Sequence, residues 1–198
     1  MAYSLDSLKD DCYPGTTVLI NKLDIRNDKL LAEAEQTITA INYAQIENEF
    51  EFVEVDFEYY KNIHKRLFYD IYEWAGMVRS VNLSKKGTAF CEYKEINELA
   101  EKRFDRLKRD NFLVDLDFET FVDEFTDLYV DLNYLHPFRE GNGRTHRLFL
   151  TLLVRNAGYS IDFSRCDLDM LMIATIKSAQ GDVGLLRTII SELIKPEM

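Results

Sequence analysis

The residues best suited to chemistry lie in one short segment, residues 136–147, which begins with His136 and Pro137. A strongly periodic apolar pattern precedes this segment. Pro137 is expected to end that helix, because proline disfavours α geometry in the residue before it. His136 would then stand at a helix end, where its imidazole can face a cleft and act as a general base.

Two glycines and two arginines follow in the same segment. Gly141 and Gly143 flank Asn142, and glycines let neighbouring backbone N–H groups turn toward one point and bind an anion. A helix that begins at Gly143 or Arg144 adds the partial positive charge of its N-terminus to that point. Arg144 and Arg147 would project from one face of this helix, where both can bind phosphate oxygens.

Glu140 is the one acid in this basic loop, which indicates a carboxylate ligand for a Mg²⁺ ion that bridges phosphates. Taken singly, each of these residues is explained as well by an ordinary turn with a capping histidine and solvated arginines. Together they supply a base, a metal carboxylate, an anion nest and two phosphate-binding arginines. The segment therefore predicts a site that transfers a phosphate-containing group from a nucleotide.

The segment is similar to the signature of the Fic family, His-x-Phe-x-(Asp/Glu)-Gly-Asn-Gly-Arg-x-x-Arg, and it satisfies every specified position. This motif is long and specific. Shorter upstream segments also resemble those of bacterial Fic proteins, so the resemblance covers nearly the whole chain. They are Tyr13-Pro14-Gly15, Asn21-Lys22-Leu23, His64 with Leu67-Phe68, Tyr72 with Trp74-Ala75-Gly76, and Lys86-Gly87 with Phe90.

The resemblance implies a protein adenylyltransferase, which moves AMP from ATP to a Tyr, Ser or Thr hydroxyl of a target protein or of itself and releases pyrophosphate. His136 would deprotonate the hydroxyl, which then attacks the α-phosphate in line. Phe138 would anchor the loop in the core, and Glu140 would ligate Mg²⁺ or Mn²⁺. The ATP-binding residues would be Gly141, Asn142 and Gly143 as an anion hole, with Arg144 and Arg147 at the β- and γ-phosphates.

Residues 78–92 are expected to contain a small β-hairpin, because two extended runs flank the polar turn Ser84-Lys85-Lys86-Gly87. This hairpin resembles the Fic flap, which aligns a target segment by adding it as an extra strand. The resemblance thus implies a target protein docked on the hairpin. It also leaves open a bacterial toxin with a separate antitoxin chain, and a homo-oligomer.

Glu35, in the first expected helix, is a candidate inhibitory residue by the same resemblance. Many Fic proteins carry an inhibitory helix with the pattern (Ser/Thr)-x-x-x-Glu-(Gly/Asn), whose glutamate pairs with a motif arginine. Leu31 and Gln36 replace the hydroxyl residue and the small residue of that pattern. The pair of Glu35 with Arg144 is therefore expected to be loose, partly solvated and below about 1 kcal/mol. An antitoxin chain is the alternative source of an inhibitory glutamate.

Most of the chain is expected to be helical, in an all-α Fic fold of one domain with a hairpin flap. Apolar residues recur at three- and four-residue steps on both sides of the loop, above all from Asp117 to Leu135. Further helices are expected near residues 28–41, 56–76, 95–109, 167–179 and 184–194, and the hairpin is the only convincing strand signal. Residues 1–50 would form an N-terminal arm and helix, and residues 51–198 the Fic core.

The formal net charge of -11 argues against a protein that coats nucleic acid or an anionic membrane, since such partners need a broad basic face. The longest apolar run, around residues 148–154, is too short to span a bilayer. The three cysteines are odd in number and widely spaced, which is typical of reduced structural thiols. We therefore expect a cytoplasmic protein.

Other polar residues have ordinary structural explanations. His64 lies on the apolar face of its expected helix and is assigned to the core. His146 occupies an unspecified motif position and is expected to be exposed. Asp162, Asp167 and Asp182 can line an adenine pocket, but helix capping explains them equally well.

Two alternatives to AMP addition stay open. The first is another reaction at the same site, such as UMP transfer, phosphate transfer or removal of AMP. Relatives of the Doc kinase type carry Lys where this chain has Gly143, which favours AMP transfer here. The second is a nucleotide-binding regulatory or toxin–antitoxin module without turnover, against which His136 argues, because a pure binder needs no base.

Overall fold

The structure of the chain, a computed structural model, describes residues 11–49, 51–85 and 87–196. Some parts of the predicted elements lie outside these described residues. They are residues 1–10 of the N-terminal arm, Phe50 at the predicted boundary, Lys86 in the hairpin turn, and residues 197–198 of the core. No described helix is long and apolar enough to cross a membrane.

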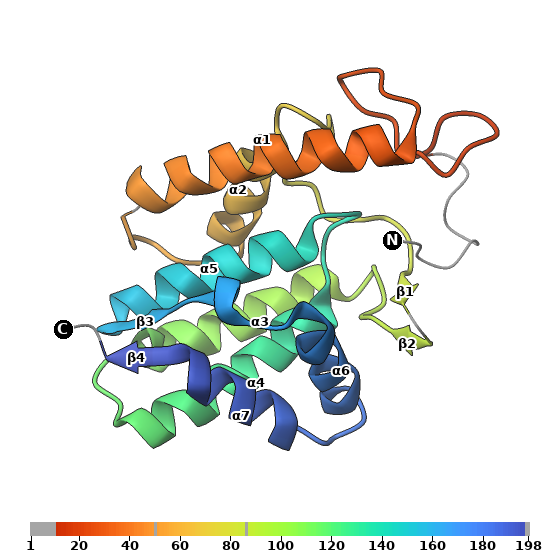
Figure 1. Cartoon of the computed structure of the whole chain (residues 1–198). Coiled ribbons are helices and arrows are strands. Elements are labelled where there is room, and N and C mark those ends of the chain that lie inside the picture. The colour runs from red at the N-terminus through yellow and green to blue at the C-terminus, as the bar shows by residue number, and fades with distance from the viewer. Residues whose placement is uncertain (1–10, 50, 86, 197–198) are drawn as a thin grey trace.

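Seven α-helices make up most of the described chain, and α5 runs through the middle of them (Figure 1). The helices are α1 (Asp28–Glu49), α2 (Phe57–Phe68), α3 (Ile96–Arg109), α4 (Phe118–Leu135), α5 (Asn142–Asn156), α6 (Leu168–Ser178) and α7 (Gly184–Leu193). Helix α5 packs against α1, α2 and α4. The prediction of a mostly helical domain is confirmed.

Helix α5 is central because its sequence is apolar on nearly every side. Residues 148–154 are all buried, and a helix that is apolar all round belongs inside a core. Neighbouring helices supply aromatic rings around it. The ring centroid of Phe149 lies 5.3 Å from that of Tyr60 in α2 and 5.5 Å from that of Phe104 in α3. The buried body of α5 thereby fixes the position of its first turn.

Capping side chains set the helix starts. Asn27 accepts a hydrogen bond from the N–H of Leu30 at 3.1 Å, where α1 begins. Asp117 accepts one from the N–H of Thr120 at 3.1 Å, where α4 begins. Each satisfies a backbone donor that the first helical turn leaves without a partner. Both starts agree with the predictions from the sequence.

Helix α2 ends earlier than predicted. The sequence places its end at Gly76, but α2 stops at Phe68, and turns lead from there to Gly76. The N–H groups of Ile71 and Tyr72 both donate to the carbonyl of Phe68, which closes the first of these turns. Both side chains are buried, so the apolar pattern of the sequence continues past the point where the helix stops.

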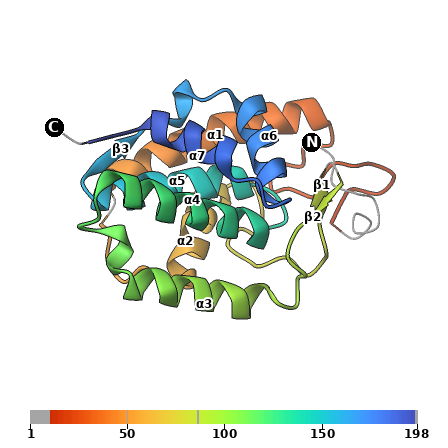
Figure 2. The same cartoon turned by 90° about the horizontal axis from the view of Figure 1, so that it is seen from below.

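Two pairs of short antiparallel strands lie at opposite ends of the helical body (Figure 1, Figure 2). Strand β1 (Ser84–Lys85) pairs with β2 (Thr88–Ala89) in the predicted hairpin, although β1 falls on residues that the sequence assigns to the turn. Strand β3 (Tyr159–Ile161) pairs with β4 (Ile194–Pro196). The sequence shows no convincing signal for this second pair, because strands of three residues are too short to show an alternating pattern.

Candidate active site

His136 ends helix α4 in a left-handed backbone conformation, with φ 39° and ψ 57°. This confirms the predicted helix end, since Pro137 disfavours α geometry at the preceding residue. Only 9% of His136 is exposed. Its imidazole stacks on the ring of Phe90, which follows strand β2, with 3.7 Å between centroids and 11° between planes. The hairpin therefore covers one face of the imidazole.

The imidazole of His136 is neutral near pH 7. Burial lowers its pKa to about 3, and the positive charges of Lys85 and Arg79 act in the same direction. A hydrogen bond to the backbone of Asn133 acts in the opposite direction, because it favours the protonated ring. A neutral imidazole keeps one ring nitrogen without a proton, and that nitrogen can accept a proton from a bound hydroxyl.

The loop after His136 lies directly on helix α2. Gly141 has φ 80°, in the left-handed region that glycine enters without strain. A Cβ at this position would lie 2.3 Å from Cζ of Phe68, a residue of α2. Both the backbone conformation and the contact therefore require glycine at position 141.

His64 of α2 contacts the same loop through a hydrogen bond and a stacked ring. Its Nδ1 accepts the N–H of Gly76 at 2.8 Å, so its Nε2 carries the proton and donates to the carbonyl of Glu140 at 3.0 Å. Its ring stacks on Phe138, with 3.8 Å between centroids. Burial lowers the pKa of His64 to about 3. The prediction of a core histidine with satisfied nitrogens is confirmed.

Asn142 closes the loop with its side-chain amide. Its Oδ1 accepts the N–H of Phe138 at 2.8 Å, and its Nδ2 donates to the carbonyl of Phe138 at 2.7 Å. Helix α5 begins at Asn142, one residue before the predicted start. The backbone N–H groups of Asn142 and Gly143 have no acceptor among the described residues, so both are available to an anion.

Gly143 leaves room for the side chain of Arg147, because glycine has no Cβ. Its backbone is helical, whereas the sequence indicates a turn glycine, and a Cβ there would lie 3.2 Å from Nη1 of Arg147. Arg147 is half-buried, and within the described part of the chain it has no ion pair with an acid. A guanidinium beside two free N–H groups is suited to binding phosphate oxygens.

Arg144 is held by Glu35 of α1. Its Nη2 donates to Oε2 of Glu35 at 2.5 Å, and its guanidinium lies 4.7 Å from the ring centroid of Phe68. The hydroxyl of Tyr72 donates to the other carboxylate oxygen of Glu35. The side chain of Glu35 is 11% exposed and that of Arg144 is 26% exposed. The expectation of a loose pair is wrong, because Tyr72 supplies a hydroxyl that Leu31 cannot, whereas the exposed fraction of Arg144 agrees with the expected partial contact with solvent.

Glu140 is a second carboxylate near Arg144, beside that of Glu35. Its Oε1 accepts the N–H of Gly141 at 2.9 Å and lies 3.9 Å from Nη2 of Arg144. Within the described residues, no three His, Cys, Asp or Glu side chains gather closely enough to hold a metal ion. A Mg²⁺ ion here would take one protein ligand from Glu140 and the others from phosphates and water, which is how Mg²⁺ commonly binds.

His146 is buried, which contradicts the prediction that it is exposed. It is 5% exposed, its ring lies 4.3 Å from that of Tyr129 in α4, and its Nε2 has no hydrogen-bond partner among the described residues. Burial lowers its pKa to about 3, helped by the nearby charge of Arg147 and by His136. The prediction fails because α5 is covered on nearly all sides, including the side that bears this position.

Arg79 is a residue of the site that the sequence did not reveal. It is 5% exposed, and its Nε donates to the backbone carbonyl of His136 at 2.8 Å. In the sequence it stands in an extended run before the hairpin, where nothing distinguishes it from a solvated arginine. Only the fold brings it to the end of α4.

The three aspartates set aside above act as caps or turn residues, as predicted. Their side chains accept backbone N–H groups of Ser164 (Asp162, 2.9 Å), Asp169 (Asp167, 2.8 Å) and Gly184 (Asp182, 3.3 Å).

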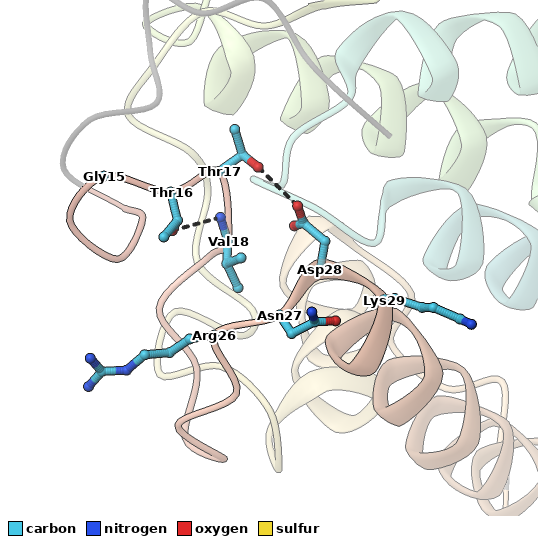
Figure 3. A pocket seen from close by; sticks show the side chains of 8 residues that line it. All are labelled: Gly15, Thr16, Thr17, Val18, Arg26, Asn27, Asp28 and Lys29. Atoms are coloured by element: carbon cyan, nitrogen blue, oxygen red, sulfur yellow. Dashed lines mark hydrogen bonds between the residues drawn. The ribbon is translucent and has the colours of Figure 1, made fainter.

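A hollow of about 670 Å³ lies elsewhere, at the N-terminus of α1 (Figure 3). Its lining, residues 15–18 and 26–29, contains no residue of the loop 136–147 and no histidine. Thr17 donates to Asp28 at 3.0 Å, and Thr16 accepts the N–H of Val18 at 3.1 Å, so these polar groups satisfy one another. The hollow lacks a base, and we place the candidate site at the loop.

A family model described as "Fic/DOC family" matches residues 54–154. The chain belongs to the Fic/DOC family. The match begins before α2 and includes the hairpin and the whole loop 136–147 of this Fic domain. A probable protein adenylyltransferase of Sinorhizobium fredii is 35% identical over 184 residues, which cover 92% of this chain and 94% of that protein.

Other Fic proteins show the same likeness. The protein adenylyltransferase VbhT of Bartonella schoenbuchensis is 36% identical over 177 residues, which cover 89% of this chain and 37% of that protein. The crystal structure of the BepC protein of Bartonella tribocorum, with bound AMPPNP, matches with a TM-score of 0.93 and 26% identity. That match covers 98% of this chain and 100% of the other. The N-terminal Fic domain of a Bartonella quintana protein with bound ADP matches with a TM-score of 0.91 and 28% identity over 94% of this chain and 95% of that one, so the fold of this chain is that of a Fic domain.

The substitution Gly141→Ala is expected to lower the free energy of unfolding by about 2–4 kcal/mol, because it adds a clash with Phe68 to the strain of a left-handed alanine. The measurement is urea-induced unfolding. Gly158→Ala is the matched control: Gly158 also has φ 80°, but a Cβ there meets no atom within 4 Å. Equal losses in the two variants would show that the contact with Phe68 contributes nothing.

Acid should destabilise the fold through its three buried histidines. An unfolded histidine has a pKa of about 6.5, whereas the three have pKa values of about 3 in the folded chain. The unfolded chain therefore binds more protons between these values, and the free energy of unfolding falls as the pH drops from about 6.5 toward about 3. Each histidine contributes at most about 1.4 kcal/mol per pH unit.

The variant His146→Phe removes one of these groups and keeps an aromatic ring against Tyr129. Its unfolding free energy, measured in urea at several pH values, is expected to fall less steeply below about pH 6 than that of the wild type. A slope identical to the wild type would mean that His146 is already protonated in the folded chain.

Proposed function

We propose that this Fic protein is a protein adenylyltransferase, which transfers AMP from ATP to a hydroxyl side chain of a protein and releases pyrophosphate. One arrangement carries the proposal: a buried neutral imidazole stands at one end of the loop, and two free backbone N–H groups stand with Arg147 at the other. The first can take a proton and the second can hold phosphate oxygens. The two relatives above are named as adenylyltransferases, and BepC holds an ATP analogue.

The hydroxyl oxygen of the target attacks the α-phosphorus of ATP, and the bond from that phosphorus to the bridging oxygen of pyrophosphate breaks. The hydroxyl proton passes to the unprotonated ring nitrogen of His136 and later to solvent. An imidazole with a pKa of about 3 is a weak base. The negative charge of a bound triphosphate raises that pKa, because it favours the protonated ring.

The phosphates are held by the start of α5. The N–H groups of Asn142 and Gly143 and the helix N-terminus stabilise the negative charge on the α-phosphate. Because the side chain of Asn142 is engaged by Phe138, this residue acts through its backbone. Arg147 and Arg144 bind the β- and γ-phosphates and so neutralise the leaving pyrophosphate.

Glu140 would hold a Mg²⁺ or Mn²⁺ ion together with the phosphates. A partly exposed carboxylate beside an anion site fits a metal that takes most of its ligands from the nucleotide. When bound, such an ion polarises phosphoryl oxygens and neutralises charge on the leaving group.

The hairpin β1–β2 would dock the target as an extra strand. It stands at one end of the helical body, and Phe90, directly after it, lies on the imidazole of His136 (Figure 1). A segment paired with this hairpin is thereby brought beside the base. Backbone pairing accepts many sequences, so the choice of target falls to other contacts.

Glu35 would restrain the enzyme by occupying Arg144. Its carboxylate is nearly buried, bonds to the guanidinium at 2.5 Å and is fixed by the hydroxyl of Tyr72. A guanidinium engaged in this way has fewer donors left for a phosphate. An isolated surface pair is worth less than about 1 kcal/mol, but a shielded pair with an added hydrogen bond is harder to open.

His136→Ala is expected to lower the rate of AMP transfer by about 10²–10⁴-fold, which is the usual contribution of a general base. Affinity for AMPPNP should stay within about threefold, because the phosphates are held by the start of α5. The measurements are auto-AMPylation with labelled ATP and calorimetric binding of AMPPNP.

His146→Phe serves as the control, since it alters a neighbouring buried histidine that the mechanism does not use. Transfer by His136→Ala at the wild-type rate would remove His136 from the mechanism. Glu140→Ala is expected to transfer AMP poorly and to gain little activity from added Mg²⁺. Full activity of the wild type in excess chelator would contradict the metal role.

Glu35→Gly is expected to raise the rate of auto-AMPylation by about tenfold or more, because it removes the free energy needed to separate Arg144 from Glu35. A factor of ten corresponds to about 1.4 kcal/mol. Labelled ATP at matched protein concentration provides the measurement. Glu33→Gly is the control. Glu33 lies on the same helix, its side chain is mostly exposed, and its one ion pair among the described residues, with Lys29, is long at 4.0 Å. A fall in the rate, seen only for Glu35→Gly, would mean that Glu35 supports Arg144 instead of restraining it.

A further inference from the structure

Arg79 is buried between the hairpin and the end of α4, with 5% of its surface exposed. Its Nε donates to the carbonyl of His136 at 2.8 Å. Its Nη1 donates to the carbonyl of Val81 at 2.5 Å, and its Nη2 donates to those of Cys91 at 2.5 Å and Leu135 at 3.5 Å. One guanidinium thus binds four backbone carbonyl groups.

These carbonyls belong to two separate parts of the site. Those of Val81 and Cys91 lie on the two legs of the hairpin, before β1 and after β2. The other two end helix α4. The backbone N–H of Arg79 adds a bond to the carbonyl of Pro137 at 2.8 Å. A single residue therefore joins both legs of the hairpin to the first residues of the loop.

This junction matters because the hairpin and the imidazole are in contact. Phe90 stacks on His136, and the next residue, Cys91, donates its N–H to the carbonyl of Tyr134 at 2.9 Å. A shift of either leg would move the hairpin relative to the imidazole. His136 also has a left-handed backbone, which a non-glycine residue keeps only where its surroundings fix it.

We propose that Arg79 is a positioning residue for AMP transfer, which holds the hairpin and His136 in one fixed arrangement so that a hydroxyl on a docked segment meets the imidazole. The catalytic part of this inference rests on the proposed function, whereas the clamp itself is a property of the fold. Arg79 acts through the backbone of its partners, because its guanidinium donates to carbonyls of the hairpin legs and of the end of α4.

The clamp needs arginine specifically. A guanidinium has five N–H donors in a rigid plane, so it can reach carbonyls on several sides at once. The ammonium group of a lysine has the same charge but concentrates its donors at one point. Arg79→Lys therefore keeps the charge and loses the clamp, and Arg79→Gln loses both.

The first test compares rate and affinity. In Arg79→Gln and in Arg79→Lys, auto-AMPylation at saturating ATP should fall by about 100-fold, the cost of a displacement of about 1 Å between reacting groups. The dissociation constant of AMPPNP should stay within about threefold. A wild-type rate in Arg79→Lys, or a loss of rate matched by an equal loss of AMPPNP affinity, would overturn the proposal.

Arg103→Gln is the matched control. Arg103 is also buried, at 7% exposed, but it lies on α3, with its Nε 2.7 Å from Oδ2 of Asp131. Loss of this arginine should destabilise the chain without lowering the rate per folded molecule. If both variants lose rate equally after correction for the folded fraction, Arg79 has only a general structural role and the proposal fails.

Hydrogen exchange tests the clamp without any assay of activity. Both Arg79 variants are expected to show faster exchange of the amides in residues 81–91 and 134–139, and Arg103→Gln is not. A wild type that transfers no AMP would overturn the proposed function, and the exchange pattern would still decide whether Arg79 joins the hairpin to the loop. Unchanged exchange in the Arg79 variants would overturn the clamp.

Discussion

The active-site loop and helix α2 touch with no space between them, and the rest of the site depends on that contact. Gly141 lies on the ring of Phe68 at a distance that leaves no room for a methyl group. His64, one turn earlier in α2, binds the carbonyl of the residue before Gly141. The loop therefore has one position along α2, and α5 has one place to begin. Since the body of α5 is the centre of the core, the packing that buries this helix also determines where its first N–H groups lie.

Charge is arranged locally and against the overall balance of the chain. The protein carries a formal net charge of -11, yet two arginines, two free N–H groups and a helix N-terminus meet at one end of α5. Glu35 and Glu140 lie at Arg144 and supply its counter-charge. A triphosphate would compete with these carboxylates for the same guanidinium. Under the proposed function, binding of nucleotide and release of Glu35 would be linked through this one side chain.

Local signals predicted most of the helices, the left-handed end of α4 and the residue types of the loop. Capping by Asn27 and Asp117 and the proline after His136 act over a few residues, so they can be read from the sequence. The incorrect predictions concern features that depend on contacts between segments distant in the sequence. The end of α2 depends on a turn whose side chains remain apolar, and β3 pairs with a strand at the other end of the chain.

The same limit applies to individual residues of the site. His146 is buried because α4 covers its side of α5, which its place in the motif does not reveal. The Glu35–Arg144 pair is tight because Tyr72, from a turn after α2, completes it. Arg79 bonds to carbonyls on three segments, and no spacing of residue types announces such bonds. Motifs identify the groups that react, while the groups that hold them come from tertiary structure.

The bonds from Arg79 to the hairpin end on backbone carbonyls, and every amino acid has one. An exposed residue of the hairpin such as Ala89 can therefore change type without altering these bonds, whereas Phe90 stacks on His136 and cannot vary freely. If a target docks on the hairpin as proposed, such changes would alter the surface that the target meets and leave the fastening of the hairpin intact. A protein built in this way would be able to acquire new targets by small evolutionary steps, because the bonds that fasten its hairpin do not depend on the exposed side chains of that hairpin.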